Sequence, residues 1–130
     1  MRYLSAEEIL VLHALVIDDT GGAHGVRDLS LLQSIAYKPQ SRFGGKELYK
    51  GPFEKAAVLL EAVANYHVFI DGNKRTALVA AARFLSINGY EFTASNKAAE
   101  KTILAVATKE ISMGKLQVWL QKNAKKLPKR

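Results

Sequence analysis

The chain contains no cysteine, and this absence excludes several chemistries at once. Disulfide scaffolds, thiolate zinc sites and cysteine nucleophiles all need the missing residue, and its absence fits a reducing compartment such as the cytoplasm. No apolar run approaches the roughly 18 residues that a membrane span needs. The N-terminus turns acidic at Glu7 and Glu8 before the apolar core of a signal peptide can form. We therefore expect a cytoplasmic protein without a membrane partner.

Several widespread motifs are missing as well. The sequence has no Gly-x-Gly-x-x-Gly, no Walker loop ending in Gly-Lys-Ser or Gly-Lys-Thr, and no His-Glu-x-x-His. It also lacks internal repeats, low-complexity stretches and any linker long enough to divide domains. With 130 residues, 48% of them hydrophobic and 24% charged, the chain is predicted to fold as one globular domain spanning residues 1–130.

The formal net charge of +7 favours an anionic partner, but much of it lies near the C-terminus. Lys122, Lys125 and Lys126 are interpreted as solvated residues that complement the C-terminal end of a last helix. Residues 123–130 are predicted to be a basic, frayed tail. Because the basic residues do not alternate with exposed aromatics, and no helix-turn-helix pattern is evident, direct binding of nucleic acid is not expected.

Apolar residues recur at helical spacing along most of the chain. Ser5 and Glu8 form a capping box, and the apolar stripe behind them predicts a helix over 6–19. Further helices are predicted after Asp28 or Ser30 and ending at Pro39, from Phe53 to Tyr66, from Thr76 to Ile87, after Ser95, and after Ser112. The expected fold class is all-α, a compact bundle of about six helices.

One segment does not follow the helical pattern. Residues 38–52 read KPQSRFGGKELYKGP, with Gly44 and Gly45 between Phe43 and Leu48. A Gly-Gly pair between potential strands is typical of a short hairpin. We therefore predict an exposed β-hairpin flap here.

The chemistry-bearing residues are concentrated between two apolar helices, in HVFIDGNKR from His67 to Arg75. Gly72 lets the backbone approach a ligand closely, and the free amides near Asn73 and Lys74 would point at an anion at the positive end of a helix dipole. Lys74 adds a point charge, and Arg75 adds a bidentate fork for phosphate oxygens. This segment is therefore predicted to bind a polyphosphate.

The other members of the segment suggest the reaction. A carboxylate beside a phosphate site repels the ligand unless Mg²⁺ bridges the two, so Asp71 predicts a magnesium site. His67 stands one turn from the anion cradle, where it could take the proton of an attacking hydroxyl in phosphoryl or nucleotidyl transfer. Phe69 is interpreted as a hydrophobic anchor of the loop. His13, on the first helix, and His24, in a turn, are interpreted as structural.

These residues resemble the Fic family, whose motif is His-Pro-Phe-x-Asp/Glu-Gly-Asn-Gly-Arg. The sequence departs from it at Val68, where the family has proline, and at Lys74, where the family has its second glycine. Asn-Lys-Arg followed by Thr76-Ala77 is similar to the death-on-curing (Doc) branch of toxins. The matching positions are His67, Phe69, Asp71, Gly72, Asn73 and Arg75.

The resemblance implies a fold, a site and a reaction. It implies a Fic-like bundle in which His67 is the catalytic base, Asp71 holds Mg²⁺, and Asn73 and Arg75 bind phosphates. The flap would add its edge to a strand of the target. ATP would be the co-substrate, and its γ-phosphate would pass to a serine or threonine of a translation factor such as elongation factor Tu, arresting translation. The residues assigned to the target-docking flap are Arg42, Phe43, Gly44, Gly45 and Lys46.

Two other functions stay open on sequence grounds. One is Fic-type adenylyltransferase activity. Lys74 argues against it, because the lysine side chain occupies space that glycine leaves for the phosphates. Leu78 also argues against it, because Fic adenylyltransferases carry arginine at that position. The other is a catalytically idle binding module. None of the eight glutamates is followed by Gly or Asn, so the inhibitory glutamate motif of Fic proteins is missing. The resemblance then implies inhibition in trans by a Phd-like antitoxin with a disordered acidic segment.

Overall fold

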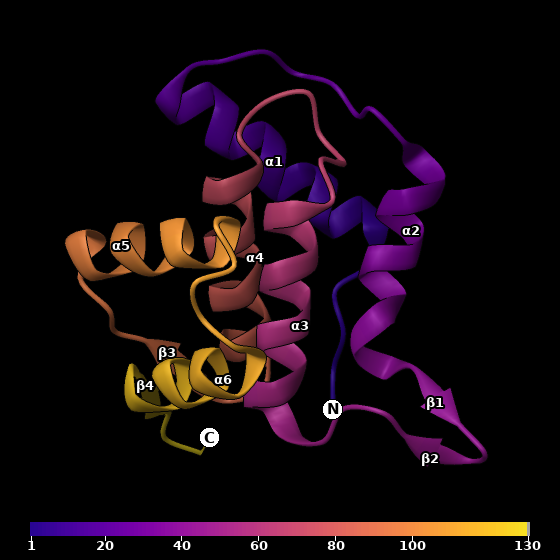
Figure 1. Ribbon diagram of the computed structural model, residues 1–130, viewed down its shortest axis with the longest axis vertical. Helices are drawn as coiled ribbons and strands as arrows, with labels where there is room; N and C mark the ends of the chain where they lie inside the picture. Colours follow the sequence, from indigo (N-terminus) through magenta and orange to yellow (C-terminus); the bar gives the residue numbers. More distant parts are fainter. Residues whose placement is uncertain (130) are drawn as a thin grey trace.

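The computed structural model describes residues 1–129 and shows a helical bundle, with a small hairpin at one side (Figure 1). Within these residues there are six α-helices and one 3₁₀ turn. They are α1 (Ala6–Thr20), α2 (Leu29–Tyr37), η1 (Lys38–Gln40), α3 (Gly51–Asn65), α4 (Asn73–Ile87), α5 (Asn96–Ala107) and α6 (Met113–Lys122). The predicted all-α fold class is confirmed.

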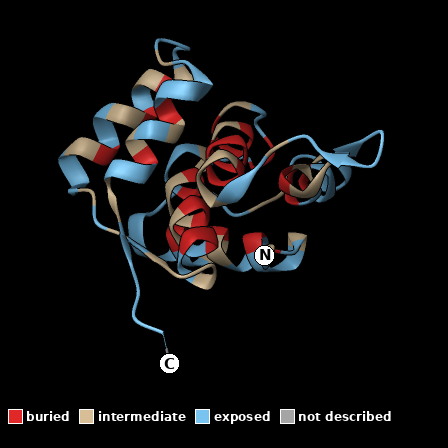
Figure 2. Ribbon diagram, turned by 90° about the horizontal axis from the view of Figure 1, so that it is seen from below, coloured by how far each residue is buried: buried red, intermediate tan, exposed pale blue. Residues whose placement is uncertain are grey.

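Helices α3 and α4 form the centre of the bundle, and the motif loop joins them. Nine residues of α3 are buried, and they lie on most of its surface, as expected of a helix covered on several sides. Small side chains such as Ala56, Ala77 and Ala80, which are fully buried, let the two helices approach closely. Figure 2 shows the buried positions gathered along the helices in the middle of the molecule, while the hairpin is exposed.

The helix starts follow the predicted capping residues. Ser5 and Glu8 form the complete capping box of α1. The side chains of Asp28, Ser95 and Ser112 each accept a hydrogen bond from a backbone amide in the first turn of α2, α5 and α6. These caps satisfy amides that have no partner within the helix. Local sequence therefore determines where four of the helices begin.

The predicted hairpin is present as β1 (Arg42–Phe43) paired antiparallel with β2 (Lys46–Glu47). Gly44 and Gly45 connect them with φ angles of 59° and 78°. Two successive positive φ angles are those of a tight hairpin turn that glycine adopts without strain.

The C-terminal segment differs from the prediction of a frayed tail. Ala124–Lys126 forms β4, which pairs antiparallel with β3 (Tyr90–Phe92). The amide of Leu127 also donates to the carbonyl of Gly89 at 2.8 Å. A lysine-rich segment shows no apolar periodicity, but its backbone can still form hydrogen bonds with the unpaired N–H and C=O groups of Tyr90–Phe92. Residues 124–127 are thus part of the fold, and the rest of the predicted tail includes Arg130, which lies outside the described residues.

Helix α4 begins at Asn73, three residues before the predicted start at Thr76. The chain enters the helix through Gly72, whose φ of 76° provides the sharp turn. Lys74 and Arg75 therefore lie in the first helical turn. In residues 1–129 no helix has both the length and the hydropathy to cross a bilayer.

Candidate active site in the loop between α3 and α4

Two apolar residues hold the motif loop against the core. Val68 and Phe69 are fully buried. The Phe69 ring stacks on the imidazole of His13, with centroids 3.8 Å apart and planes 4° from parallel. His13 Nε2 donates to the carbonyl oxygen of Asp71 at 2.8 Å. Phe69, predicted to anchor the loop, is thus packed in the core, and His13 contacts both its ring and the backbone of Asp71.

A segment distant in sequence pairs with the loop backbone. Val26 forms an antiparallel bridge with Phe69. The amide of Arg27 donates to the Val68 carbonyl at 2.8 Å, and the amide of Ile70 donates to the Gly25 carbonyl at 3.1 Å. Because buried backbone groups need partners, the connection between α1 and α2 serves as a support for the motif loop.

Asn73 bonds back to the loop through both ends of its side-chain amide. The Phe69 amide donates to Asn73 Oδ1 at 3.0 Å, and Asn73 Nδ2 donates to the Phe69 carbonyl at 2.9 Å. The sequence predicts that Asn73 binds phosphate. In the structure its side chain ties the loop to the start of α4, while its backbone amide lies in the uncapped first turn.

His67 is exposed and is the first residue of the motif after α3. Its φ of 54° lies in the left-handed region, which is uncommon for a residue with a β-carbon. Such a conformation costs about 1–3 kcal/mol and is found most often at functional sites. The imidazoles of His13 and His24 each have a polar partner, to Asp71 and Asp18. Among residues 1–129 no hydrogen bond holds the His67 imidazole.

The N-terminus of α4 is open to an anion. No side chain caps it, and the first amides of a helix have no partner within the helix. A β-carbon on Gly72 would lie 2.9 Å from Ile17 Cδ1, so the backbone passes close to α1 here. Lys74 and Arg75 are exposed in this turn, and the hydroxyl of the next residue, Thr76, is buried without a described partner. Positive charge and free donors are thus brought together in the first turn of α4.

Asp71 is exposed, with its carboxylate oriented by backbone amides. Oδ2 accepts from the Ala23 amide at 3.2 Å and Oδ1 accepts from the Gly72 amide at 3.2 Å. A β-carbon at Gly22 would lie 2.8 Å from Asp71 Oδ2, so glycine is required beside it. Within residues 1–129 no group of three or more metal-ligating side chains is present. A single oriented carboxylate still suits Mg²⁺, which commonly binds through one or two carboxylates plus substrate phosphates and water.

A cavity of about 380 Å³ lies between α4 and α5, beside the motif. Lys74 and Arg75 contribute to its wall, and Leu78, Phe92 and Ile103 give it an apolar lining. Its volume is within the range of roughly 300–1,000 Å³ for small-molecule pockets. Glu100 also lines this cavity, so its wall joins apolar surface to charges of both signs, with the two cations at the motif.

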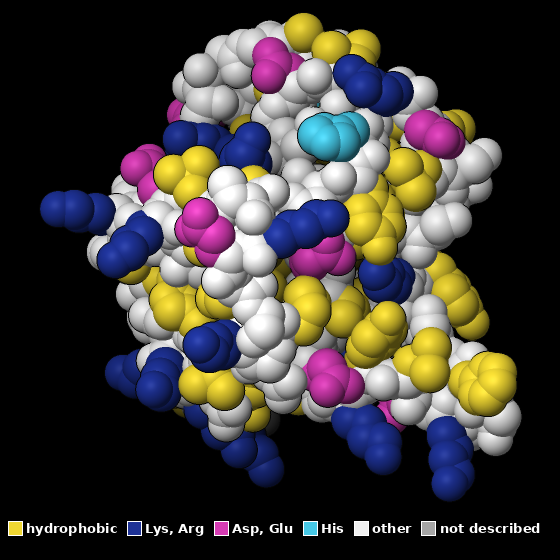
Figure 3. Space-filling view, viewed as in Figure 1, with side chains coloured by type: hydrophobic (Ala, Val, Ile, Leu, Met, Phe, Trp, Pro, Cys, Tyr) yellow, Lys and Arg dark blue, Asp and Glu magenta, His cyan; other side chains and the backbone are white. Residues whose placement is uncertain are grey.

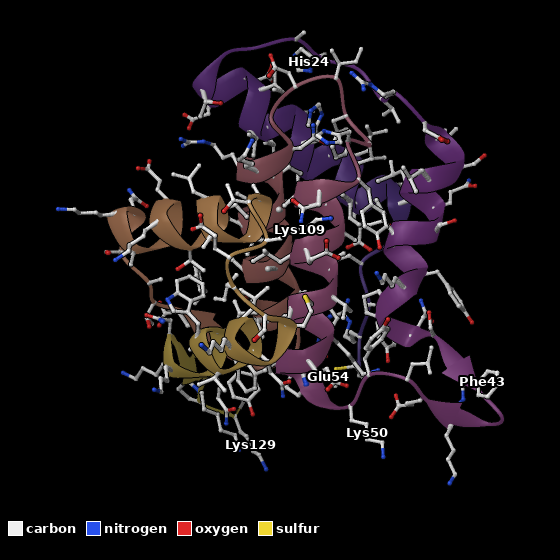
Figure 4. The ribbon with its side chains drawn as sticks, in the orientation of Figure 1. His24, Phe43, Lys50, Glu54, Lys109 and Lys129 are labelled. Atoms are coloured by element: carbon white, nitrogen blue, oxygen red, sulfur yellow. The ribbon has the colours of Figure 1, made fainter. Side chains whose placement is uncertain are left out.

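The structure does not bring the predicted flap residues to the motif. The hairpin precedes the N-terminus of α3, and the motif follows its C-terminus, so they lie at opposite ends of this helix (Figure 1). Figure 4 labels Phe43 at the hairpin, far from His24 in the segment that supports the motif loop. With 15 residues, α3 is about 22 Å long. The docking role of the flap stays a prediction.

Some supporting residues were not identified from the sequence. Residues 21–25 read as a flexible turn, whereas Gly22 and Gly25 bring this segment against the motif loop. A β-carbon at Gly25 would lie 2.6 Å from Ile70 Cδ1. Lys55 also was not predicted to matter, yet it is buried beneath the hairpin. The run of glycines could have indicated the close approach of residues 21–25 to the loop. A lysine inside an apolar helix could have indicated the buried role of Lys55.

The comparisons with known proteins agree with this geometry. A profile of the Fic/DOC family matches residues 3–85, a span that includes the hairpin and the motif. Toxin Doc of Mycolicibacterium smegmatis is 37% identical over 114 residues, which cover 86% of this chain and 85% of that protein. Protein kinase doc of Escherichia phage P1 is 40% identical over 113 residues, which cover 87% of this chain and 88% of that protein. The similarity thus extends well beyond the motif.

Proposed function

Since this chain belongs to the Fic/Doc family, we propose that it is the toxin of a toxin-antitoxin pair and acts as a protein kinase. The reaction would transfer the γ-phosphate of ATP to a serine or threonine hydroxyl of a translation factor of the elongation factor Tu type. The observation that carries the proposal is an exposed histidine that has no side-chain hydrogen bond within residues 1–129 and shares a short loop with a helix N-terminus carrying two cations.

In this reaction the chain's residues bind, orient and move one proton. The hydroxyl oxygen of the target forms a bond to the γ-phosphorus, the bond from that phosphorus to the bridging oxygen of ADP breaks, and the hydroxyl proton passes to His67. The free amides of α4, with Lys74 and Arg75, would hold the phosphates and stabilise charge on the transferred group. Bonds from Asn73 to both polar groups of Phe69 keep the loop in place while this occurs.

Mg²⁺ is the expected cofactor, and Asp71 is the residue that would hold it. When bound, the ion would neutralise charge on the phosphate oxygens. The contribution of this chain is the orientation of the carboxylate, which the Ala23 and Gly72 amides provide.

The relatives support the choice of reaction and the type of partner. One of them is named a protein kinase and another a toxin. Lys74 lies at the position where Fic enzymes have glycine, and its side chain contributes to the cavity beside the motif. A lysine there favours a nucleotide orientation that presents the γ-phosphate. An acidic, partly disordered antitoxin would suit the net charge of +7.

The test uses ATP labelled at either the α- or the γ-phosphate, with Mg²⁺ and purified elongation factor Tu. We expect the γ label alone on the protein target, detected by autoradiography and placed on a serine or threonine by mass spectrometry. Transfer of the α label would instead identify an adenylyltransferase. If neither label is transferred while ATP binds, the idle-module alternative holds.

A further inference from the structure

Two adjoining cavities form a groove along one partly buried face of α3. Their volumes are about 350 and 270 Å³, and both include Glu61 and Met113 in their walls. The first extends to Leu48 and Tyr49, which follow the hairpin, and the second extends to Asn65, the last residue of α3. This α3 groove therefore runs from the residues just after the hairpin to Asn65, two residues before His67.

The sides of the α3 groove come from elements on either side of α3. Figure 4 labels Glu54 near the start of α3 and Lys109 in the turn after α5, on the same face of the molecule. Leu48 is 52% exposed and Met113 is 39% exposed, so apolar surface is available to a partner. Figure 3 shows this face with hydrophobic side chains beside charges of both signs. Mixed charge with apolar surface suits a peptide segment rather than a polyanion.

A polar contact joins Lys38, in the wall of the cavity at the hairpin end, to the residue that precedes the motif. Lys38 Nζ donates to the hydroxyl of Tyr66 at 2.6 Å and lies 5.0 Å from the centre of its ring. Burial opposes the charge of Lys38, but the bond to Tyr66 and the nearby Tyr49 and Glu61 raise the pKa of Lys38 above its ordinary value. Tyr66 directly precedes His67, so this contact links the wall of the groove to the catalytic loop.

Backbone strain occurs near the other end of the groove, where the second cavity reaches Asn65. Within residues 1–129, His67 and Lys109 are the non-glycine residues with positive φ, at 54° and 61°. Lys109 lines the cavity that reaches Asn65. Strained residues persist where the surrounding structure holds them and often mark ligand contacts.

We propose that the α3 groove is the docking path for an extended segment of the target protein, with one end against the hairpin and the acceptor hydroxyl at His67. This rests on the kinase function proposed above. It accounts for the separation of the flap from the motif, because a bound strand can reach both. The length of α3, about 22 Å, corresponds to about seven residues of extended chain. Target choice would then depend on side chains up to about seven residues from the modified hydroxyl.

The test blocks the groove without straining the fold. Gly114 lies in α6 and lines the groove, and a β-carbon there would meet nothing within 4 Å. Gly114→Trp would therefore place a bulky ring in the path. Gln121→Trp is the matched control, since Gln121 is exposed on the same helix and lines none of the described cavities.

Binding and transfer are measured separately with purified elongation factor Tu. In the His67→Asn background, which removes the base, we expect Gly114→Trp to weaken binding at least tenfold by calorimetry, and Gln121→Trp to bind like its parent. In the otherwise wild-type chain, Gly114→Trp should raise KM for the target and leave the Kd for ATP unchanged. Binding without transfer of either label would contradict the kinase function alone.

Other outcomes would overturn the groove proposal. Equal target affinity of Gly114→Trp and its control, with both proteins folded by circular dichroism, would show that the segment docks elsewhere. The groove proposal is also overturned if the wild-type chain does not bind elongation factor Tu at all. If Gly114→Trp abolishes binding of an antitoxin but not of the target, the groove is an antitoxin site.

Discussion

The motif loop and the hairpin are both irregular segments beside α3, but they are held in very different ways. The loop has two fully buried side chains, a stacked histidine and paired backbone bonds to residues 25–27. The hairpin has strands of two residues, all exposed, and Phe43 at its turn is 79% exposed. Its attachment depends largely on one side chain, Lys55.

Lys55 is 1% exposed, and its ammonium group bonds the hairpin to the core. Nζ donates to the Pro39 carbonyl at 2.9 Å and to Glu47 Oε1 at 3.0 Å, and it lies 5.3 Å from the centre of the Tyr3 ring. Burial acts to lower the pKa of Lys55, but Tyr3 and Glu47 outweigh it and raise the pKa. The comparison teaches that the motif loop is preorganised by tertiary contacts, while the hairpin is tethered at its base and free at its tip.

The largest expected effect is on catalysis at the loop. His67→Asn should lower phosphoryl transfer by about 10²- to 10⁴-fold, the usual contribution of a general base. Asparagine tolerates the left-handed conformation, so the midpoint of urea unfolding should stay within error of wild type. His24→Asn serves as control, because His24 is an exposed histidine paired with Asp18. Retained activity in His67→Asn would remove His67 from the mechanism.

Breaking the support of the loop should cost stability. Asn73→Ala leaves the amide and carbonyl of buried Phe69 without partners, so we expect a loss of about 1–3 kcal/mol in the free energy of unfolding. Urea denaturation measures this loss, and hydrogen exchange should speed up at residues 68–70. Asn96→Ala, at an exposed asparagine in the first turn of α5, is the control. Unchanged exchange at the loop would show that the Asn73 amide does not hold it.

Breaking the tether of the hairpin should have a smaller and more local effect. Lys55→Met keeps the stem but removes the bonds to Pro39 and Glu47, and we expect a loss of about 1–2 kcal/mol. Exchange should increase at residues 42–47 and stay unchanged at 68–70, the reverse of Asn73→Ala. Lys46→Met, at an exposed hairpin lysine, should alter neither. If Lys55→Met loosens both regions equally, the two supports are not independent.

The same tether predicts a pH dependence. The bond from Lys55 holds the pKa of Glu47 below its usual value. A depressed carboxyl pKa stabilises the fold above the unfolded value of about 4.3, and this stability is lost as pH falls through the folded pKa. The difference in stability between wild type and Glu47→Gln should therefore be constant near neutrality and shrink on acidification below about pH 4. Denaturant titrations at pH 7 and in acid test this, and a difference that grows in acid would contradict it.

The two regions also differ in how far the sequence predicted them. Helix caps at Ser5, Ser95 and Ser112 depend on local hydrogen bonds, so they could be read directly. The density of functional residues from His67 to Arg75 likewise identified the loop. The partners of that loop, such as Ala23 for Asp71, lie about 50 residues away and follow no periodic pattern, so only the folded chain brings them together.

The C-terminal strand illustrates the same limit. Residues 124–126 pair with Tyr90–Phe92 through backbone groups. Such pairing does not require alternating apolar side chains, so the sequence of this segment carried no strand signal. Asn73 illustrates a second limit of sequence-based prediction. The motif predicts that Asn73 binds phosphate, but it does not reveal that Oδ1 and Nδ2 of Asn73 already bond the loop backbone. Pattern predicts where chemistry is concentrated, and tertiary contacts decide which atom performs each task.

The smallest expected effect concerns Lys109, which shares a left-handed backbone conformation with His67. A substitution there tests whether this strain serves target docking. Lys109→Gly removes a β-carbon from a position with a φ of 61°, so we expect a gain of about 1 kcal/mol in the free energy of unfolding. Because Lys109 lines the α3 groove and not the cavity beside the motif, ATP binding should not change, whereas affinity for the target should fall slightly. Thermal unfolding and target titration measure the two effects. A gain in stability without any loss of affinity would mean that the strain at Lys109 has no role in docking, and that only His67 keeps its conformation for function.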